Sequence, residues 1–426
     1  MNNSISKFIL FVTSKFKPFL IKIMPIELLR KVKRKLVKNL IDKNMHRNNK
    51  RYDRSKNPDG INFIGLIKAE VGLGQSCRLI AEAIDNTDIE YTVFNQIQIN
   101  SCRQEDSSWD NKISNTTPFN INLIHINPPD LAIAYLTLDK SIWDYKYNIA
   151  FWLWELEEFP DEWVKCFDLL DEIWTPSEFV SDSIRKKTSL PVYTMIYPIS
   201  TPTNENFNRK YFKLPEDKFL YLCMYDSNSM TERKNPMAAI NSFKSAFEPS
   251  EQNIGLIIKI NNPDSKDLEL INQSLKDYSN IYIINKIMTK TEVNSLIKNV
   301  DVLVSLHRAE GFGLPLAEAM LLGTPTIATN WSANTEFMND DIACMVDFDL
   351  ITLDKDYGVF KKGNRWADPN IGQAAMFMRK LYEDKAFYNS ISLEAQNYIK
   401  NNLNIKKASK AIQNRINDIY NDEVNK

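Results

Sequence analysis

Residues that bind metal ions or form disulfides are scarce in this sequence. Its 426 residues include three histidines, His46, His125 and His307, which leaves little basis for a multi-histidine metal centre. Its five cysteines are scattered, without a CxxC pair or a histidine at zinc spacing. They are Cys77, Cys102, Cys166, Cys223 and Cys344. We therefore predict no metal site, and free thiols in a reducing cytosol.

Long apolar runs are also missing. Residues 8–12 are apolar, and residues 16–24 are apolar but interrupted by Lys17, Pro18 and Lys22. A membrane-spanning helix needs roughly 18–20 apolar residues, and no small-residue cleavage site follows that would fit a secretory signal. We predict neither a membrane span nor a signal peptide in this region.

Charge is balanced overall but unevenly distributed. Residues 1–56 carry sixteen Lys or Arg and three acids, a net charge of +13, whereas the whole chain has a net charge of −1. A helix that starts at Pro25 would gather four aliphatic residues on one face, with basic residues around them. The four are Leu29, Val32, Leu36 and Leu40. We predict that this basic extension, residues 1–60, contacts anionic lipid on the inner face of the cytoplasmic membrane through residues 1–50. The alternative is a basic helix that is packed on the protein's own surface or loosely ordered.

The length of the chain suits two or three domains. From residue 61 onwards, short buried strands alternate with helix-like segments, as in doubly wound α/β proteins. Polar residues 201–213 mark a hinge, and a second set of strands begins at residue 219. Near the C-terminus, residues 366–369 are expected to open a helix over 370–382.

Two glycines follow the first strand, which is expected over residues 61–67. Gly72 and Gly74 lie in the predicted turn before a helix over residues 76–84. Glycines at such a turn let the backbone approach a ligand closely. The plainer interpretation is a tight turn without a ligand.

The most informative stretch is residues 301–330, DVLVSLHRAEGFGLPLAEAMLLGTPTIATN. Pro315 and Gly323 are helix start and stop signals. The pattern predicts strands over 301–307 and 324–329 and a helix over 314–322. A strand, a loop with glycines and a helix N-terminus form the usual nucleotide pocket of such sheets. Glu310 would lie on the loop and Glu318 about one turn into the helix, which suits hydroxyls at two ends of an elongated ligand.

Adjacent cations follow the strand predicted over residues 219–224. Arg233 and Lys234 stand in one loop with Ser229, just before a helix expected over residues 237–247. Guanidinium and ammonium groups beside a phosphate-facing crevice suit a diphosphate.

Carboxylates and tryptophans crowd the segment YNIAFWLWELEEF, residues 147–159. Trp154 and Glu155 stand at the expected end of a strand, and His125 and Asn127 stand at the end of the preceding one. Ligands bind at the carboxyl ends of strands in open α/β sheets, so Trp154, His125 and Asn127 are candidates for the acceptor side of a site. Glu155, a carboxylate flanked by apolar residues, is a candidate catalytic residue together with Glu310, Arg233 and Lys234. Tryptophan is, however, more often a core residue than a platform for a sugar.

The spacing Glu310-x7-Glu318 within EGFGLPLAEAMLLGTPTIAT resembles the donor-binding signature of glycosyltransferase family 4, the retaining GT-B enzymes. The resemblance implies that Glu310 binds hydroxyls of the donor sugar and that Glu318 binds the ribose. It assigns the diphosphate to Arg233, Lys234 and backbone N–H groups of the glycine loop. The loop residues concerned are Gly311, Phe312, Gly313 and Leu314, and the Gly72–Gly74 turn would face the cleft from the other domain.

The resemblance covers about residues 61–410 and is less specific in the N-terminal half. Many members carry a histidine where this chain has Trp154-Glu155, which resembles a subset with a WEL motif. The implied fold is GT-B, two Rossmann-like domains facing a cleft. The implied domains are an acceptor domain over 61–200, a donor domain over 201–395, and C-terminal helices over 396–426 that cross back.

The implied activity is retaining transfer of a sugar from a nucleotide diphosphate sugar, which serves as co-substrate, without a metal or other cofactor. The acceptor would be a hydroxyl of a glycan or a lipid-linked molecule in surface polysaccharide synthesis. The donor phosphate would take the acceptor's proton, so no strong base is needed. We reject glycoside hydrolysis by two carboxylates, because the Arg233-Lys234 pair would then have no role.

Three other functions remain to be weighed. A dinucleotide-dependent oxidoreductase would need GxGxxG after the first strand, and the chain offers only Gly72 and Gly74. A catalytically inactive GT-B-like subunit that binds a nucleotide or glycan is the main alternative. Nucleic-acid binding through the basic extension lacks any supporting motif.

Overall fold

The computed structural model describes residues 28, 35, 39, 47, 49–96, 103–263 and 265–424. Apart from single positions, the predicted N-terminal helix lies outside these residues, so the predicted membrane contact stays a prediction. None of the helices within the described ranges is both long and apolar enough to cross a bilayer.

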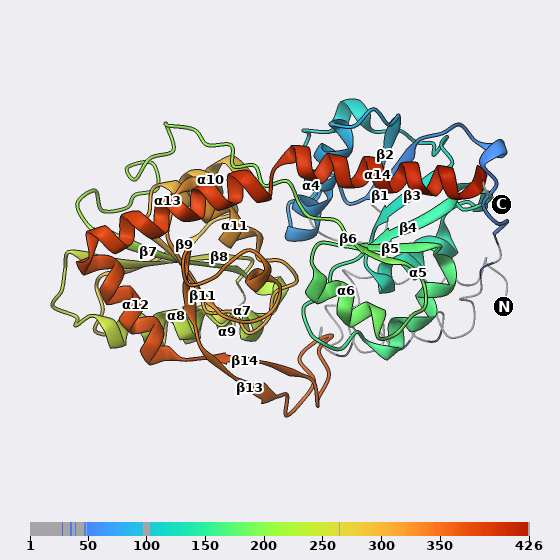
Figure 1. Cartoon of the computed structure of the whole chain (residues 1–426). Helices are drawn as coiled ribbons and strands as arrows, with labels where there is room; N and C mark the ends of the chain where they lie inside the picture. Colours follow the sequence, from blue (N-terminus) through green and yellow to red (C-terminus); the bar gives the residue numbers. More distant parts are fainter. Residues whose placement is uncertain are drawn as a thin grey trace.

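Two six-stranded parallel sheets lie side by side and form the framework (Figure 1). The first has the order β2-β1-β3-β4-β5-β6. Its inner strands are buried on both faces, as in β1, where all five residues are buried, and this fits apolar sequence without alternation. The strands are β1 (Ile61–Gly65), β2 (Tyr91–Asn95), β3 (Ile121–His125), β4 (Tyr147–Phe151), β5 (Glu172–Thr175) and β6 (Val192–Thr194). Helices α4 (Gly72–Asp85), α5 (Pro128–Thr137) and α6 (Glu178–Arg185) accompany them.

The second sheet has the order β12-β11-β10-β7-β8-β9. Its strands are β7 (Phe219–Asp226), β8 (Ile254–Asn261), β9 (Ile281–Asn285), β10 (Val302–Ser305), β11 (Thr326–Thr329) and β12 (Cys344–Val346). Its helices are α7 (Thr231–Lys234), α8 (Pro236–Ala246), α9 (Ser265–Ser274), α10 (Lys290–Lys298), α11 (Leu314–Leu322) and α12 (Ile371–Glu383). The strand order reverses between β7 and β10, and ligands bind at such a switch point. The sheets confirm the predicted α/β class.

Gly72 and Gly74 lie in a helix, not in the turn before it. Helix α4 begins at Gly72, whereas the sequence pattern predicted a start near Ser76. A Cβ atom at Gly74 would lie 2.0 Å from the carbonyl oxygen of Ala69, so only glycine fits there. A Cβ atom at Gly72 would meet nothing within 4 Å. The close approach at Gly74 is therefore to the chain itself.

An antiparallel hairpin, residues 348–369, extends from the second sheet toward the first (Figure 1). It consists of β13 (Phe348–Thr352), β14 (Arg365–Pro369) and the loop between them. The helix predicted over 370–382 is confirmed as a helix over Ile371–Glu383 with Asn370 as its N-cap, and residues 366–369 before it pair with β13 as a strand.

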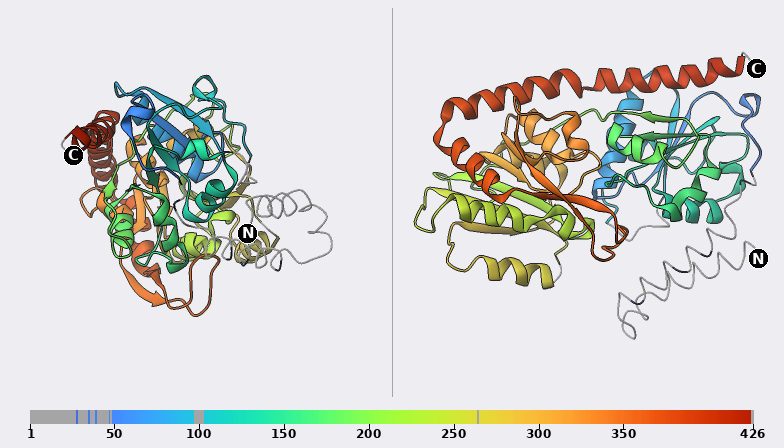
Figure 2. Two further views of the ribbon diagram at one scale, coloured as in Figure 1. Left: turned by 90° about the vertical axis from the view of Figure 1, so that its right-hand side faces the viewer. Right: turned by 60° about the horizontal axis from the view of Figure 1, so that its bottom comes forward.

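The C-terminal helices span both sheets (Figure 2). Helix α13 (Lys385–Asn402) packs on α11, and α14 (Ile405–Val424) packs on α4 of the first domain. Arg415 of α14 forms an ion pair with Glu172 of β5 at 2.6 Å, and the Glu172 side chain is fully buried. Trp174 and Tyr147 also donate hydrogen bonds to this carboxylate. The predicted return of these helices to the first domain is confirmed.

Replacing Arg415 by methionine should destabilise the protein by about 3 kcal/mol, because it leaves the Glu172 carboxylate buried without its cation. Urea unfolding at neutral pH measures this loss. Lys410→Met is the matched control, since Lys410 lies exposed on the same helix. Equal unfolding midpoints for the two variants would contradict the expectation.

Candidate active site

Four charged side chains converge where the two domains meet. Lys234 donates to Glu310, and the Arg233 guanidinium lies 3.5 Å from the same carboxylate. Glu155, in the loop after β4 of the first domain, lies 3.9 Å from Arg233. Three of these residues follow β7 and β10, at the switch point of the second sheet. The structure thus brings together Arg233, Lys234, Glu310 and Glu155, the four residues predicted to be catalytic.

Arg233 also ties the loops after β7 and β10 together. Its guanidinium donates to the carbonyl oxygen of Ala309 at 2.8 Å and to that of Ser229 at 3.0 Å. Its own carbonyl accepts from the backbone N–H of Arg308 at 2.8 Å. Arg233 is only 4% exposed. Ser229 therefore contributes its backbone carbonyl to this arrangement.

The protonation of the pair follows from burial and charge. Burial opposes ionisation of Glu310, but Lys234 and then Arg233 outweigh it and lower the pKa of the carboxyl from 4.5 to about 2. Burial lowers the pKa of Lys234, with Glu310 acting in the opposite direction. Glu310 is thus held as an anion that accepts hydrogen bonds.

The glycine loop leads into the N-terminus of α11, which begins at Leu314 as predicted. Gly313 adopts a left-handed conformation with φ 96°, and Pro315 occupies the first turn. The N–H groups of Gly313 and Leu314 have no acceptor within the helix by position. They lie where an anion is favoured. Lys234, Glu310, Gly313 and Pro315 border a small cavity at this point.

The side chain of Phe312 has a packing role in this loop. Its ring packs edge-on against Tyr197 of the first domain, with ring centroids 4.9 Å apart, and against Phe337 at 5.1 Å. The ring is 6% exposed. Only the backbone of Phe312 is available for the phosphate role that the family resemblance implies.

Glu318 lies on α11, is 2% exposed, and forms an ion pair with Lys290 at the start of α10. Lys290 is not among the predicted site residues. The sequence predicts its position at the start of a helix after a strand, but nothing in the sequence pairs it with Glu318. The carboxylate assigned to the ribose is thus neutralised by a neighbouring cation.

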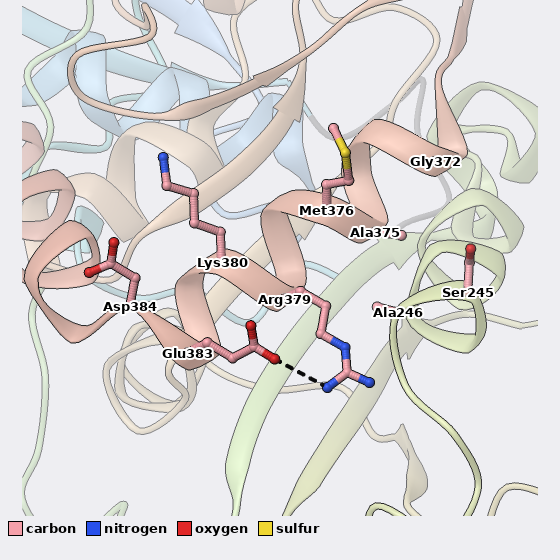
Figure 3. A pocket seen from close by; sticks show the side chains of 9 residues that line it. All are labelled: Ser245, Ala246, Gly372, Ala375, Met376, Arg379, Lys380, Glu383 and Asp384. Carbon is pink, nitrogen blue, oxygen red and sulfur yellow. Dashed lines mark hydrogen bonds and ion pairs between the residues drawn. The ribbon is translucent and has the colours of Figure 1, made fainter.

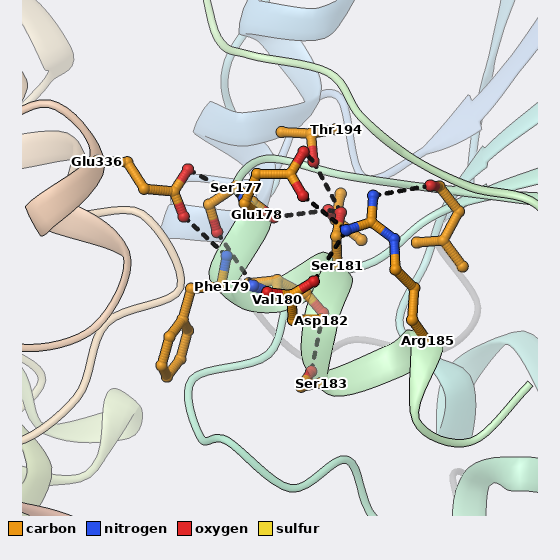
Figure 4. Close-up of polar contacts among 12 residues, drawn as sticks. Ser177, Glu178, Phe179, Val180, Ser181, Asp182, Ser183, Arg185, Thr194 and Glu336 are labelled. Carbon is orange, nitrogen blue, oxygen red and sulfur yellow. Dashed lines mark hydrogen bonds and ion pairs between the residues drawn. The ribbon is translucent and has the colours of Figure 1, made fainter.

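Two further contacts join the glycine loop region to the first domain. The Ser177 hydroxyl donates to the carbonyl oxygen of Gly311 at 2.9 Å. The Glu336 carboxylate accepts from the backbone N–H groups of Glu178 and Phe179, at 2.9 and 2.7 Å, at the first turn of α6 (Figure 4). A Cβ atom at Gly311 would lie 2.4 Å from the carbonyl oxygen of Trp154. The glycine loop is therefore also a contact between the domains.

The acceptor-side predictions need correction. The Trp154 ring is 1% exposed and packs against Trp163 and Phe360, so it offers no face to a sugar. His125 is fully buried, stacks on Phe151, and has its pKa lowered to about 3 by burial. Asn127 accepts from the backbone N–H of Leu153 at 3.0 Å, which fixes the chain just before Trp154-Glu155. Both rings are core residues, and Asn127 supports the loop that carries Glu155.

A separate surface hollow of about 510 Å³ lies between α8 and α12 (Figure 3). Its arginine already has acidic partners, since Arg379 pairs with Glu251 at 2.6 Å and with Glu383 at 3.5 Å. None of the predicted site residues borders it.

Glu310→Gln should weaken the dependence of the protein's stability on pH in the acid range. The folded-state pKa of Glu310 is depressed, so its contribution to stability is present above about pH 4.5 and disappears as the pH falls toward about 2. Thermal unfolding midpoints of the wild type and the variant should converge over this range. A constant difference between them would contradict the expected titration.

Residues 204–347 match the family model described as glycosyl transferases group 1. This segment contains Arg233, Lys234, Glu310 and Glu318, as well as the glycine loop. No curated protein matches the chain in sequence.

Solved structures with the same architecture are glycosyltransferases of the GT-B fold. HepE of Anabaena, in complex with UDP and glucose, matches with a TM-score of 0.62 and 11% identity, over 84% of this chain and 100% of that one. Sucrose-phosphate synthase of Thermosynechococcus elongatus matches with a TM-score of 0.61 and 10% identity, over 85% and 99%. A glycosyltransferase of Rickettsia africae matches with 0.59 and 12%, also over 85% and 99%. The chain has the GT-B fold, as predicted.

Proposed function

We propose that this protein is a retaining glycosyltransferase that moves a sugar from a nucleotide diphosphate sugar to a hydroxyl group. The glycosyl transferases group 1 match and the GT-B fold support nucleotide-sugar glycosyl transfer. The observation that carries the proposal is the cluster of Lys234, Arg233 and Glu310 beside the N-terminus of α11.

Each part of this cluster has a use in the reaction. The leaving group is a nucleoside diphosphate, whose developing negative charge Arg233, Lys234 and the first N–H groups of α11 would stabilise. Glu310, held ionised, would accept hydrogen bonds from donor sugar hydroxyls. These groups supply the stabilisation without a metal, and the donor phosphate would take the acceptor's proton.

The finer assignments are part of the same proposal. We assign a hexose to the donor and a glycan or lipid-linked molecule to the acceptor, in synthesis of a surface polysaccharide. Support for a nucleotide sugar comes from HepE, which was solved with UDP and glucose. The basic residues 1–56 support an acceptor near an anionic membrane.

Thermal-shift screening against UDP, GDP, ADP, CMP, TDP and NAD tests the donor class. A nucleoside diphosphate should raise the unfolding midpoint, because it binds only the folded protein. Stabilisation by NAD alone would favour an oxidoreductase, and the absence of any shift would favour an inactive subunit.

Two site variants separate the roles of the charged residues. Glu310→Ala should abolish sugar transfer while nucleotide binding remains measurable, whereas Lys234→Ala should weaken nucleotide binding itself. Lys380→Ala in the separate hollow is the control and should change neither. Equal loss of nucleotide binding in both site variants would contradict the division of roles.

Deleting residues 1–44 should reduce binding to vesicles containing anionic lipid, because most of the basic residues are removed. The deletion stops before Arg47, since its guanidinium pairs with Asp171 at 2.6 Å and belongs to the first domain. Vesicles of zwitterionic lipid are the control, and co-sedimentation is the measurement. Unchanged binding to anionic vesicles would refute the membrane contact.

A further inference from the structure

The hairpin of residues 348–369 belongs to the second domain but completes the core of the first. Three of its apolar side chains, Leu353, Phe360 and Trp366, are 2–3% exposed. They lie in one apolar cluster with tryptophans of the first domain, Trp152, Trp154 and Trp163. The hairpin is therefore anchored across the domain boundary by buried contacts.

Two contacts of the hairpin are with Trp154 and Glu157, which flank Glu155 in the chain. The rings of Phe360 and Trp154 have centroids 5.3 Å apart. The Arg365 guanidinium lies 3.0 Å from the carboxylate of Glu157. Glu155 stands between these two contacts in the chain.

The hairpin also touches both loops that carry the other charges of the site. The backbone N–H of Ala367 donates to the carbonyl oxygen of Arg308 at 2.9 Å, two residues before Glu310. A Cβ atom at Gly358 would lie 2.5 Å from the terminal methyl group of Met230, three residues before Arg233. One element thus contacts all three loops from which the four charged side chains project.

We propose that this hairpin is a strap that positions Glu155 opposite Arg233, with Phe360 and Arg365 as its positioning residues. They act through Trp154 and Glu157 and never touch the reacting groups themselves. The expected effect on turnover rests on the proposed transferase function. The effect of the hairpin on the loop that carries Glu155 can be tested without an activity assay.

If the hairpin acts in this way, loosening it should affect turnover and nucleotide binding differently. Lys234 and Glu310 both belong to the second domain and pair with each other, so loosening only the contacts of the hairpin with Trp154 and Glu157 leaves nucleotide binding intact. Glu155 comes from the first domain, and a small displacement of a group at a reacting centre can lower the rate by up to about 100-fold. A loosened strap should therefore lower kcat without changing nucleotide affinity.

The first experiment compares Phe360→Ala with Val359→Ala. Val359 is the neighbouring residue and is 40% exposed, so its truncation removes no buried contact. Hydrogen exchange of the backbone amides of residues 152–158 should be faster in Phe360→Ala and unchanged in Val359→Ala. In sugar transfer, Phe360→Ala should lower kcat by at least about tenfold and leave the Kd for the stabilising nucleoside diphosphate within experimental error.

The second experiment does not depend on a buried truncation and therefore covers the case in which Phe360→Ala fails to fold. Arg365→Glu places like charges together and should accelerate exchange in residues 152–158 and lower kcat. Adding Glu157→Arg restores an opposite pair and should reverse both effects.

Three outcomes overturn the strap: unchanged exchange in folded Phe360→Ala, a loss of nucleotide affinity that matches the loss of kcat, or no rescue by the charge swap. Failure of the proposed function is distinguishable, because it appears in the wild type as absence of both nucleotide binding and transfer. The exchange measurements then still decide whether the hairpin holds the loop.

Discussion

The buried ion pair between Glu310 and Lys234, with Arg233 beside it, is the interaction on which the arrangement of the site depends. An isolated charge in this environment would cost several kcal/mol, so neither the carboxylate nor the cations can be accommodated alone. Because Glu310 follows β10 and the cations follow β7, the pair forces two loops from adjacent strands into one place. The same junction is fixed by two hydrogen bonds, from the Arg233 guanidinium to the Ala309 carbonyl and from the Arg308 N–H to the Arg233 carbonyl.

The same loop also joins the domains. Gly311 fits against the backbone of Trp154, its carbonyl accepts from Ser177, and Phe312 packs on Tyr197. Whatever binds at Glu310 therefore binds at a contact between the domains.

Much of this could be predicted from the sequence because the signals were local. The stretch 301–330 contains a buried strand, a proline in the first turn and a glycine after the last, and α11 has the predicted bounds. The four charged residues lie at strand ends, and the parallel topology brings strand ends together. For the same reason, the strand after residue 219 and the helix near 237 appear close to the predicted positions.

What could not be predicted depends on distant pairings. The hairpin joins strands separated by a long loop, and β13 is largely exposed, so its sequence lacks a buried-strand pattern. Lys290 meets Glu318 only through the packing of α10 on α11. His125 and Trp154 were placed at the correct strand ends, but polarity at a strand end does not reveal whether the side chain points into the core.

The charges of the site suggest how it would work in the proposed reaction. Arg233 and Lys234 carry two positive charges, and Glu155 and Glu310 carry two negative ones, so the cluster is neutral before a ligand enters. A diphosphate would compete with the carboxylates for the cations. As the cations shift toward phosphate, Glu310 would be freed to accept from sugar hydroxyls, which pair with a carboxylate at little cost. The site is therefore suited to an exchange of partners, in which each buried charge keeps a compensating group throughout.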